Sequence, residues 1–324
     1  MLNRRQSPWI FLLTLSECAM LSACAMPASK ALGQSTQSPL ASYEKQFHTE
    51  KISRDGFDLY YRSLGVGQPV LILSGGPGDD CDYMLPVAAE IAKHAHAILL
   101  EQRGTGRSIP PVVDKTTVNL ALYLQDFEAL RTHLNIQQWT VVGHSAGGVL
   151  AMDYAAAFPD RINKLILLDS APVAFQYLAA FQDNMLDRLS PEERDQMTKL
   201  QNSNSPEDQE SMGKLLVDAL FFNRKLGDQL VPSLVHARHG NVGYLLGTEI
   251  TAPGYNLRSR LKNFEGPVLV LNGRQDPMDP LMAYETSAAF KNSTLEFIDR
   301  AGHFPWFERP KEFDDAIDGF LQSK

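Results

Sequence analysis

The chain has 324 residues, of which 44% are hydrophobic and 21% charged, and its formal net charge is −8. This composition is that of a globular protein with enough apolar material for a full core, which excludes a disordered chain. The acidic balance argues against a nucleic-acid partner or a polybasic membrane patch. Three cysteines are too few for a disulfide scaffold or a cysteine-rich zinc module.

The first 23 residues have the features of an export signal. Arg4 and Arg5 precede a short apolar stretch that begins at Trp9. The stretch ends in Leu-Ser-Ala-Cys, which is similar to the lipobox of bacterial lipoproteins and implies that Cys24 is lipidated. Ala25 then favours the outer membrane, so we expect an exported, periplasm-facing protein that contacts the membrane only through this anchor. Plain secretion is the alternative.

After a predicted flexible tether at 24–45, short apolar runs alternate with helical stretches. The runs predict strands at 57–62, 70–73, 97–100, 139–142, 164–168, 268–271 and 295–298. Two of the intervening stretches, 120–134 and 147–157, have helical patterns. Strands that alternate with helices predict an α/β fold with a mostly parallel sheet covered on both faces.

The alternation stops between 171 and 255. Ser190 and Ser205 each precede a proline and have an acidic residue three positions on, which is a pattern typical of helix starts. We therefore predict a helical cap at 171–255, inserted into a core made of 46–170 and 256–324.

The strongest motif is Gly-His-Ser-Ala-Gly at 143–147, directly after one predicted strand and directly before a helix. This context is the one that a G-x-S-x-G nucleophile needs, because small neighbours let the chain turn sharply and expose the serine. The motif predicts Ser145 as the nucleophile. The Ala146 N–H, at the start of the helix, would donate to the oxyanion.

A serine nucleophile needs a base and an orienting acid, which follow it in this order along such a chain. Asp276 and His303 each lie just past a predicted strand, where open α/β sheets place their sites. Asp279 is the rival acid, but it precedes Pro280 and we expect it to cap the next helix. Ser145, Asp276 and His303 together predict acyl transfer without a metal or an organic cofactor.

Three blocks in order resemble the α/β-hydrolase superfamily and, within it, the proline iminopeptidase group. They are Ser-Gly-Gly-Pro-Gly at 74–78, Glu-Gln-Arg-Gly-Thr-Gly-Arg-Ser at 101–108, and the Ser145 turn. The resemblance implies the α/β-hydrolase fold with a helical cap, and a second oxyanion N–H at Gly76. It also implies an aminopeptidase that acts on short peptides.

Two residues depart from that group. Ser74 stands where the group has His, and Ala146 stands where it usually has Trp. An esterase or lactonase acting on a small molecule is therefore the alternative function. A lipoprotein that only binds its ligand is a more remote one, and the intact triad argues against it.

An aminopeptidase must bind a free α-ammonium group, for which a carboxylate is the natural partner. The cap glutamates at 192, 193, 207 and 210 lie at predicted helix starts, where capping explains them. Glu249 does not, so we predict it as the amine anchor. The histidine pairs at 94 and 96 and at 236 and 239 have no accompanying carboxylate motif, and we predict no metal site.

Overall fold

The computed structural model describes residues 40–323, apart from 175, 177, 201, 202, 204 and 235–240. The predicted export signal and Cys24 lie outside the described residues. The end of the predicted tether does not extend as a linker, because Ala41–Glu44 form the short helix α2 and the side chain of Leu40 is buried. None of the described helices is both long enough and apolar enough to cross a membrane.

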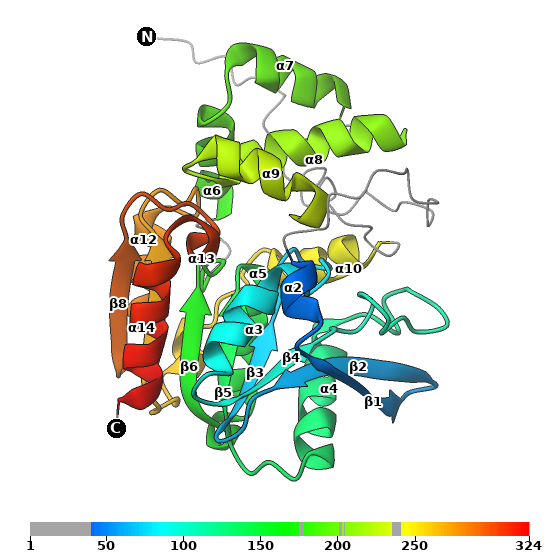
Figure 1. Ribbon diagram of the computed structural model, residues 1–324, viewed down its shortest axis with the longest axis vertical. Helices are drawn as coiled ribbons and strands as arrows, with labels where there is room; N and C mark the ends of the chain where they lie inside the picture. The colour runs from blue at the N-terminus through cyan, green and yellow to red at the C-terminus, as the bar shows by residue number, and fades with distance from the viewer. Residues whose placement is uncertain are drawn as a thin grey trace.

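Within the described residues, eight strands form a single sheet in the order β1-β2-β4-β3-β5-β6-β7-β8 (Figure 1). The pairs β1–β2 and β2–β4 are antiparallel, and the remaining neighbours are parallel. The strands are β1 (His48–Arg54), β2 (Phe57–Leu64), β3 (Pro69–Leu73), β4 (His96–Leu100), β5 (Trp139–His144), β6 (Ile162–Leu168), β7 (Val268–Gly273) and β8 (Ser293–Ile298). The predicted fold class is confirmed. The sequence did not predict β1, because this edge strand is mostly exposed and has no apolar run.

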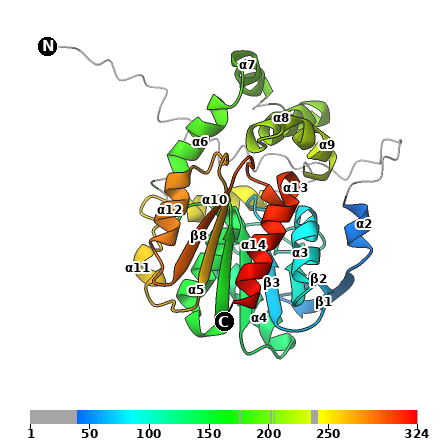
Figure 2. The ribbon, with the colours of Figure 1, turned by 60° about the vertical axis from the view of Figure 1, so that its left-hand side comes forward.

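Helices cover both faces of the sheet. On one face lie α4 (Leu120–His133), α5 (Ala146–Ala157), α11 (Arg258–Leu261) and α12 (Pro280–Ser287). On the other lie α3 (Leu85–Ile91) and α14 (Pro310–Gln322), which Figure 2 shows next to each other. Shorter turns of helix are η1 (Asp82–Met84), η2 (Pro159–Arg161) and α13 (Pro305–Glu308).

The central strands are apolar at successive positions because each face of the sheet has its own core. Val141 of β5 packs into the cluster under α4 and α5, and Val142 packs into the cluster under α3 and α14. Strand β6 alternates in the same way. A side chain of this size contributes roughly 1.5–3 kcal/mol when fully buried, so both faces hold the sheet together.

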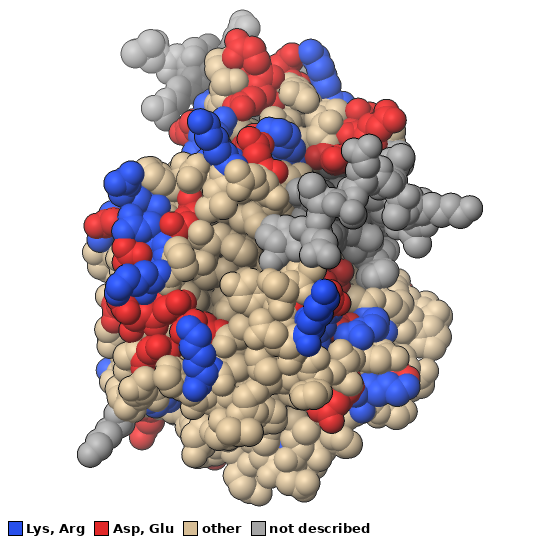
Figure 3. Space-filling view, viewed as in Figure 1, with Lys and Arg blue, Asp and Glu red and all other residues tan. Residues whose placement is uncertain are grey.

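The cap lies between β6 and β7 and consists of α6 (Leu178–Asp187), α7 (Pro191–Leu200), α8 (Pro206–Leu220), α9 (Arg224–Leu234) and α10 (Val242–Ile250). Figure 1 shows α6–α9 above the carboxyl ends of the parallel strands. The predicted helix starts are found: the Glu193 N–H donates to Ser190 Oγ at 3.2 Å, and the Asp208 N–H donates to Ser205 Oγ at 3.1 Å. Figure 3 shows acidic and basic side chains interspersed over the cap on the face in view.

Candidate active site

Ser145 occupies a sharp turn between β5 and α5. Its backbone has φ 53° and ψ −121°, a conformation that a residue with a Cβ adopts at a cost of roughly 1–3 kcal/mol. Glycines on either side allow the close approach of the chain. A Cβ on Gly143 would lie 2.3 Å from the Gly147 carbonyl oxygen, and one on Gly147 would lie 2.4 Å from the Ser74 carbonyl oxygen. The surrounding backbone therefore fixes the turn that presents the serine.

The two predicted oxyanion donors belong to segments that meet at this turn. Ala146 is the first residue of α5, and Gly76 lies with φ +116° in the loop after β3. A Cβ on the neighbouring Gly75 would lie only 2.7 Å from Ser145 Cβ. Neither the Ala146 N–H nor the Gly76 N–H has a hydrogen-bond acceptor among the described residues. Both amides are therefore available to an oxygen that develops negative charge.

The loops after β7 and β8 bring the predicted acid and base together. His303 Nδ1 lies 2.9 Å from Asp276 Oδ2, and both side chains are buried. The other carboxylate oxygen, Asp276 Oδ1, accepts the Met278 N–H at 2.9 Å. A carboxylate at Nδ1 favours the tautomer with the proton on that nitrogen, which leaves Nε2 as the basic atom.

The rival acid faces elsewhere. Asp279 is the N-cap of α12, and its Oδ1 accepts the Leu281 N–H at 2.7 Å. The same residue has φ +58°, which is uncommon for a residue with a side chain. Asp279 therefore organises the helix start, while Asp276 holds the histidine.

A chain of hydrogen bonds that the sequence did not reveal joins the Gly75–Gly76 loop to the His303 loop. The Gly75 N–H donates to Tyr83 Oη at 2.6 Å, and this hydroxyl lies 2.8 Å from His144 Nδ1. His144 Nε2 in turn lies 3.0 Å from the His303 carbonyl oxygen.

The direction of this chain follows from its two ends. The His303 carbonyl can only accept, so His144 Nε2 carries a proton and donates it. Complete burial, together with the neighbouring His303 ring 4.6 Å away, holds the pKa of His144 well below its usual range. His144 is therefore neutral, and its Nδ1 accepts the Tyr83 hydroxyl proton. The residue before Ser145 thus contacts the backbone of His303.

The segments 74–78 and 101–108, which resemble the proline iminopeptidase group, also contact each other. Gln102 Nε2 donates to the Ser74 carbonyl oxygen and to Ser74 Oγ, both at 3.1 Å. Ser74 therefore has a defined role where the proline iminopeptidase group has histidine: its side chain fastens the start of the glycine loop to the 101–108 turn.

The cap is attached directly to the catalytic histidine loop. The His303 N–H donates to the carbonyl oxygen of Leu220, at the end of α8, at 2.8 Å. Glu308 joins the same two segments, because it accepts the Gly302 N–H and the Asn223 N–H, each at 2.6 Å. Burial raises the pKa of Glu308, while these amide contacts act against the rise. Nothing in the sequence pattern distinguished Glu308 from a surface acid at a helix end.

Glu249 has a structural partner. Both of its carboxylate oxygens lie 3.3 Å from the Leu120 N–H, at the start of α4. The other end of α10 is the one near the glycine loop, because Val242 packs within 3.1 Å of the position of a Cβ on Gly78. Seven residues of helix correspond to about 10 Å between these two positions. The described contacts do not bring Glu249 to the triad.

Three possible metal-ligand atoms lie together in the described part of the chain. Atoms of Asp169, Asp276 and His303 are all within 4.8 Å of one another. Two of these residues already contact each other at hydrogen-bonding distance, as described above. Of the predicted non-ligating histidines, His94 contacts Asp318 at 3.2 Å on the surface, and residues 236 and 239 lie outside the described residues.

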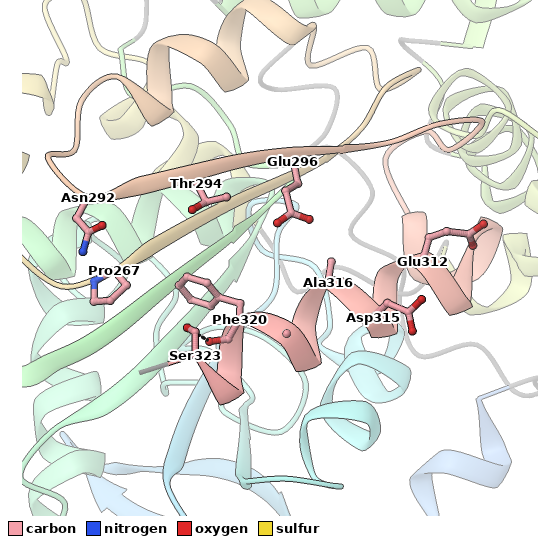
Figure 4. A pocket seen from close by; sticks show the side chains of 10 residues that line it. Pro267, Asn292, Thr294, Glu296, Glu312, Asp315, Ala316, Phe320 and Ser323 are labelled. Atoms are coloured by element: carbon pink, nitrogen blue, oxygen red, sulfur yellow. Dashed lines mark hydrogen bonds between the residues drawn. The ribbon is translucent and has the colours of Figure 1, made fainter.

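A groove of about 610 Å³ lies elsewhere, between β8 and α14 (Figure 4). Asn292, Glu296, Asp315 and Phe320 are among the residues that line it, and none of the triad residues does. We therefore assign the chemistry to the carboxyl ends of β5, β7 and β8.

A serine on a strained turn, with a buried histidine–aspartate pair beside it, defines a serine hydrolase site of the α/β type. The chain belongs to the alpha/beta hydrolase fold family, whose model matches residues 68–310. Among curated relatives, the proline iminopeptidase of Heyndrickxia coagulans is 27% identical over 271 residues, which cover 80% of this chain and 92% of that protein.

Solved structures show the same fold. Proline iminopeptidase from Mycobacterium smegmatis has a TM-score of 0.63 and 19% identity, over 85% of this chain and 97% of that one. A thermophilic esterase from Thermogutta terrifontis has a TM-score of 0.62 and 22% identity, over 85% of this chain and 98% of that one. At such identities the likeness concerns the fold alone.

Proposed function

We propose that this protein is a serine aminopeptidase of the proline iminopeptidase type, which releases a small or cyclic residue from the N-terminus of short peptides. The observation that carries the proposal is the match to a proline iminopeptidase over most of both chains. The contact between the 74–78 and 101–108 blocks supports it, because the two blocks that resemble that group form one unit beside Ser145.

The reaction proceeds through an acyl-enzyme. His303 Nε2 takes the proton of Ser145 Oγ as this oxygen forms a bond to the scissile carbonyl carbon. The Ala146 and Gly76 N–H groups hold the oxyanion, and losing one such donor typically costs about 3 kcal/mol of transition-state stabilisation. The carbon–nitrogen bond then breaks and the leaving amine takes the proton from His303. A water molecule releases the acyl group by the same steps in reverse.

An esterase or lactonase is the second candidate, and two observations favour it. Ala146 leaves the position after the nucleophile without the tryptophan usual in iminopeptidases. The predicted amine anchor, Glu249, already accepts a backbone N–H at the start of α4. An ester substrate needs no partner for an ammonium group, so neither feature would hinder it.

Parallel assays of aminoacyl-arylamides and short-chain aryl esters separate these candidates. The peptidase proposal predicts turnover of prolyl- and alanyl-arylamides that Ser145→Ala abolishes. If Glu249 anchors the substrate amine in spite of its contact with Leu120, Glu249→Gln raises KM for arylamides but not for esters; an unchanged KM leaves it as the partner of the Leu120 N–H alone. Cleavage of esters alone would establish the esterase. If a fluorophosphonate probe fails to label Ser145, the remaining candidate is a lipoprotein that binds its ligand without catalysis.

We further propose that the protein is exported and anchored through a lipidated Cys24 in the periplasm-facing part of the envelope. The Leu-Ser-Ala-Cys tetrad at the end of the apolar stretch supports this location. Incorporation of labelled fatty acid, lost in Cys24→Ser, is the expected result. A soluble mature protein that begins at another residue would indicate plain secretion.

A further inference from the structure

Asp169 is a buried carboxyl group to which the mechanism above gives no role. It follows β6 directly, is fully buried, and has φ +41°. Its Oδ1 accepts the Gly273 N–H, at the end of β7, at 2.7 Å. Its Oδ2 is buried and has no hydrogen-bond donor among the described residues. A buried polar atom without a partner calls for a physical explanation.

The surroundings of Asp169 are mostly acidic. One of its carboxyl oxygens lies within 4.8 Å of a carboxylate oxygen of Asp276 and of a ring nitrogen of His303. Glu308 adds a second negative charge nearby, while the cap residue Arg188 is a cation that interacts with Asp276 and Glu308. An ionised Asp169 would therefore place a second charge beside the catalytic carboxylate, in a site without water-exposed surface.

We propose that Asp169 is a positioning residue in the form of a neutral carboxylic acid, whose Oδ2–H donates a hydrogen bond to the Asp276 carboxylate. This inference rests on the proposed serine hydrolase function. It provides the missing partner of Oδ2. The pair then holds one negative charge, which matches the single positive charge that forms on His303 during the reaction.

Electrostatics point the same way. Burial raises the pKa of Asp169 well above its usual range, and the charge of Asp276 raises it further, while the Gly273 N–H acts in the opposite direction. Two carboxyl groups that share a site commonly divide one proton between them in this way. The hydrogen bonds also distinguish the partners, since both oxygens of Asp276 already accept, from His303 and from Met278, whereas Asp169 Oδ2 has no donor among the described residues.

The key variant is Asp169→Asn. The asparagine Oδ1 can accept the Gly273 N–H and its Nδ2 can donate to Asp276, which reproduces the hydrogen bonds of the neutral acid. The substitution removes a charge only if Asp169 is ionised in the native protein. We expect kcat/KM for a reactive aryl ester to stay within about twofold of wild type, with the acidic limb of its pH profile unmoved.

An ionised Asp169 predicts a different pH profile for the asparagine variant. If Asp169 is ionised, its loss removes a negative charge close to the imidazole, and the acidic limb would move to lower pH by about one unit or more. That shift would overturn the proposal. Asp299→Asn, which removes an exposed carboxylate paired with Arg274, is the matched control and should leave the profile unchanged.

Asp169→Leu tests the hydrogen bonds of this side chain. It keeps the branched shape, with larger methyl groups, but offers neither the donor to Asp276 nor the acceptor of the Gly273 N–H, and we expect kcat to fall about tenfold with little change in KM. Recovery of kcat in the asparagine variant would show that these hydrogen bonds, and not bulk, are required. Equal activity of both variants would overturn the positioning role.

A measurement without substrate keeps this inference separate from the proposed function. Difference infrared spectroscopy of wild type against Asp169→Asn at neutral pH should show the carbonyl stretch of one protonated carboxyl group, present only in wild type. A carboxylate band in its place would refute the neutral acid even if the enzyme proved active. The band would support the neutral acid even if no tested peptide or ester were cleaved.

Discussion

The catalytic edge of the core and the helical cap differ in how their residues are held. Around Ser145, backbone atoms pack so closely that Gly143 and Gly147 have no room for a Cβ, and every position of β5 and β7 is buried. In the cap, by contrast, α7 has no buried residue among those described, and exposed ion pairs such as Lys199–Asp195 contribute about 0.3–0.5 kcal/mol each. The turn that presents Ser145 is therefore held by close backbone packing, whereas α7 is held by few buried contacts.

The two regions are nevertheless joined directly at the loop that holds His303. Leu220 and Asn223, at the junction of α8 and α9, bond to the His303 loop directly and through Glu308. The side chain of Asn184, on α6, also donates to the Pro277 carbonyl oxygen, next to Asp276, at 3.1 Å. A shift of the cap would therefore reach the loops that hold His303 and Asp276.

The largest expected effect tests the assignment of the acid in the core. Asp276→Asn should lower kcat by about 10⁴-fold, because an amide at this position no longer favours the reactive tautomer of His303. Asp279→Asn should lower it little, since Asp279 caps α12 and an asparagine caps a helix almost as well. Steady-state kinetics on one aryl ester compare the two. The reverse ranking would move the acid to Asp279.

A pair of glycine variants tests the comparison of packing. Gly147→Ala should lower the free energy of unfolding by about 3 kcal/mol or more, because its Cβ would meet the Ser74 carbonyl oxygen at 2.4 Å. Gly227→Ala, in cap helix α9, meets only side chains, at 3.1 Å or more, and should change stability by less than about 1 kcal/mol. Urea denaturation measures both. Similar losses would mean that the cap is packed as tightly as the core.

The sequence revealed the residues whose positions follow from a simple rule. Ser145 and Asp276 follow the fully buried strands β5 and β7, His303 follows the partly exposed strand β8, and the carboxyl ends of parallel strands lie at one edge of the sheet. The same rule singles out Asp169, directly after the predicted strand 164–168, which the sequence analysis did not consider. The fold class was predictable for the same reason, because the central strands are buried on both faces.

Other features depend on contacts between distant segments and could not be predicted from local pattern. Glu249 lies 129 residues from Leu120, whose N–H it accepts, so no local signal distinguished a helix-capping role from an amine anchor. Glu308 and Tyr83 likewise act through backbone groups of other loops. The strand β1 could not be predicted because it is mostly exposed and its sequence has no apolar run.

A smaller effect is expected from opening the hydrogen-bond chain beneath the site. Tyr83→Phe keeps the ring contacts with Phe304 and Trp306, but leaves the Gly75 N–H without its acceptor and His144 Nδ1 without its donor. The cost is about 1–3 kcal/mol, and we expect kcat to fall about tenfold while KM stays nearly constant. Tyr244→Phe, an exposed residue of α10, is the control. Unchanged kinetics in Tyr83→Phe would show that the chain does not position the oxyanion loop.

The most direct contrast of core with cap concerns the pH dependence of stability that two aspartates of opposite behaviour produce. Burial raises the pKa of Asp169 in the core, whereas the hydroxyl groups of Ser203 and Ser205 lower the pKa of Asp208 in the cap. Above the unfolded value near 3.9, the folded protein keeps the Asp169 proton that the unfolded chain releases. Wild type therefore loses stability relative to Asp169→Asn as the pH rises above that value. Asp208 has the opposite sign, because its stabilising contribution is present above its unfolded pKa and is lost as the pH falls.

The loss of stability caused by Asp208→Asn should thus shrink in acid, while the gain of stability caused by Asp169→Asn grows towards neutrality. Urea denaturation of the three proteins at several pH values measures both trends. Parallel curves for wild type and Asp169→Asn would mean that the folded protein holds Asp169 ionised.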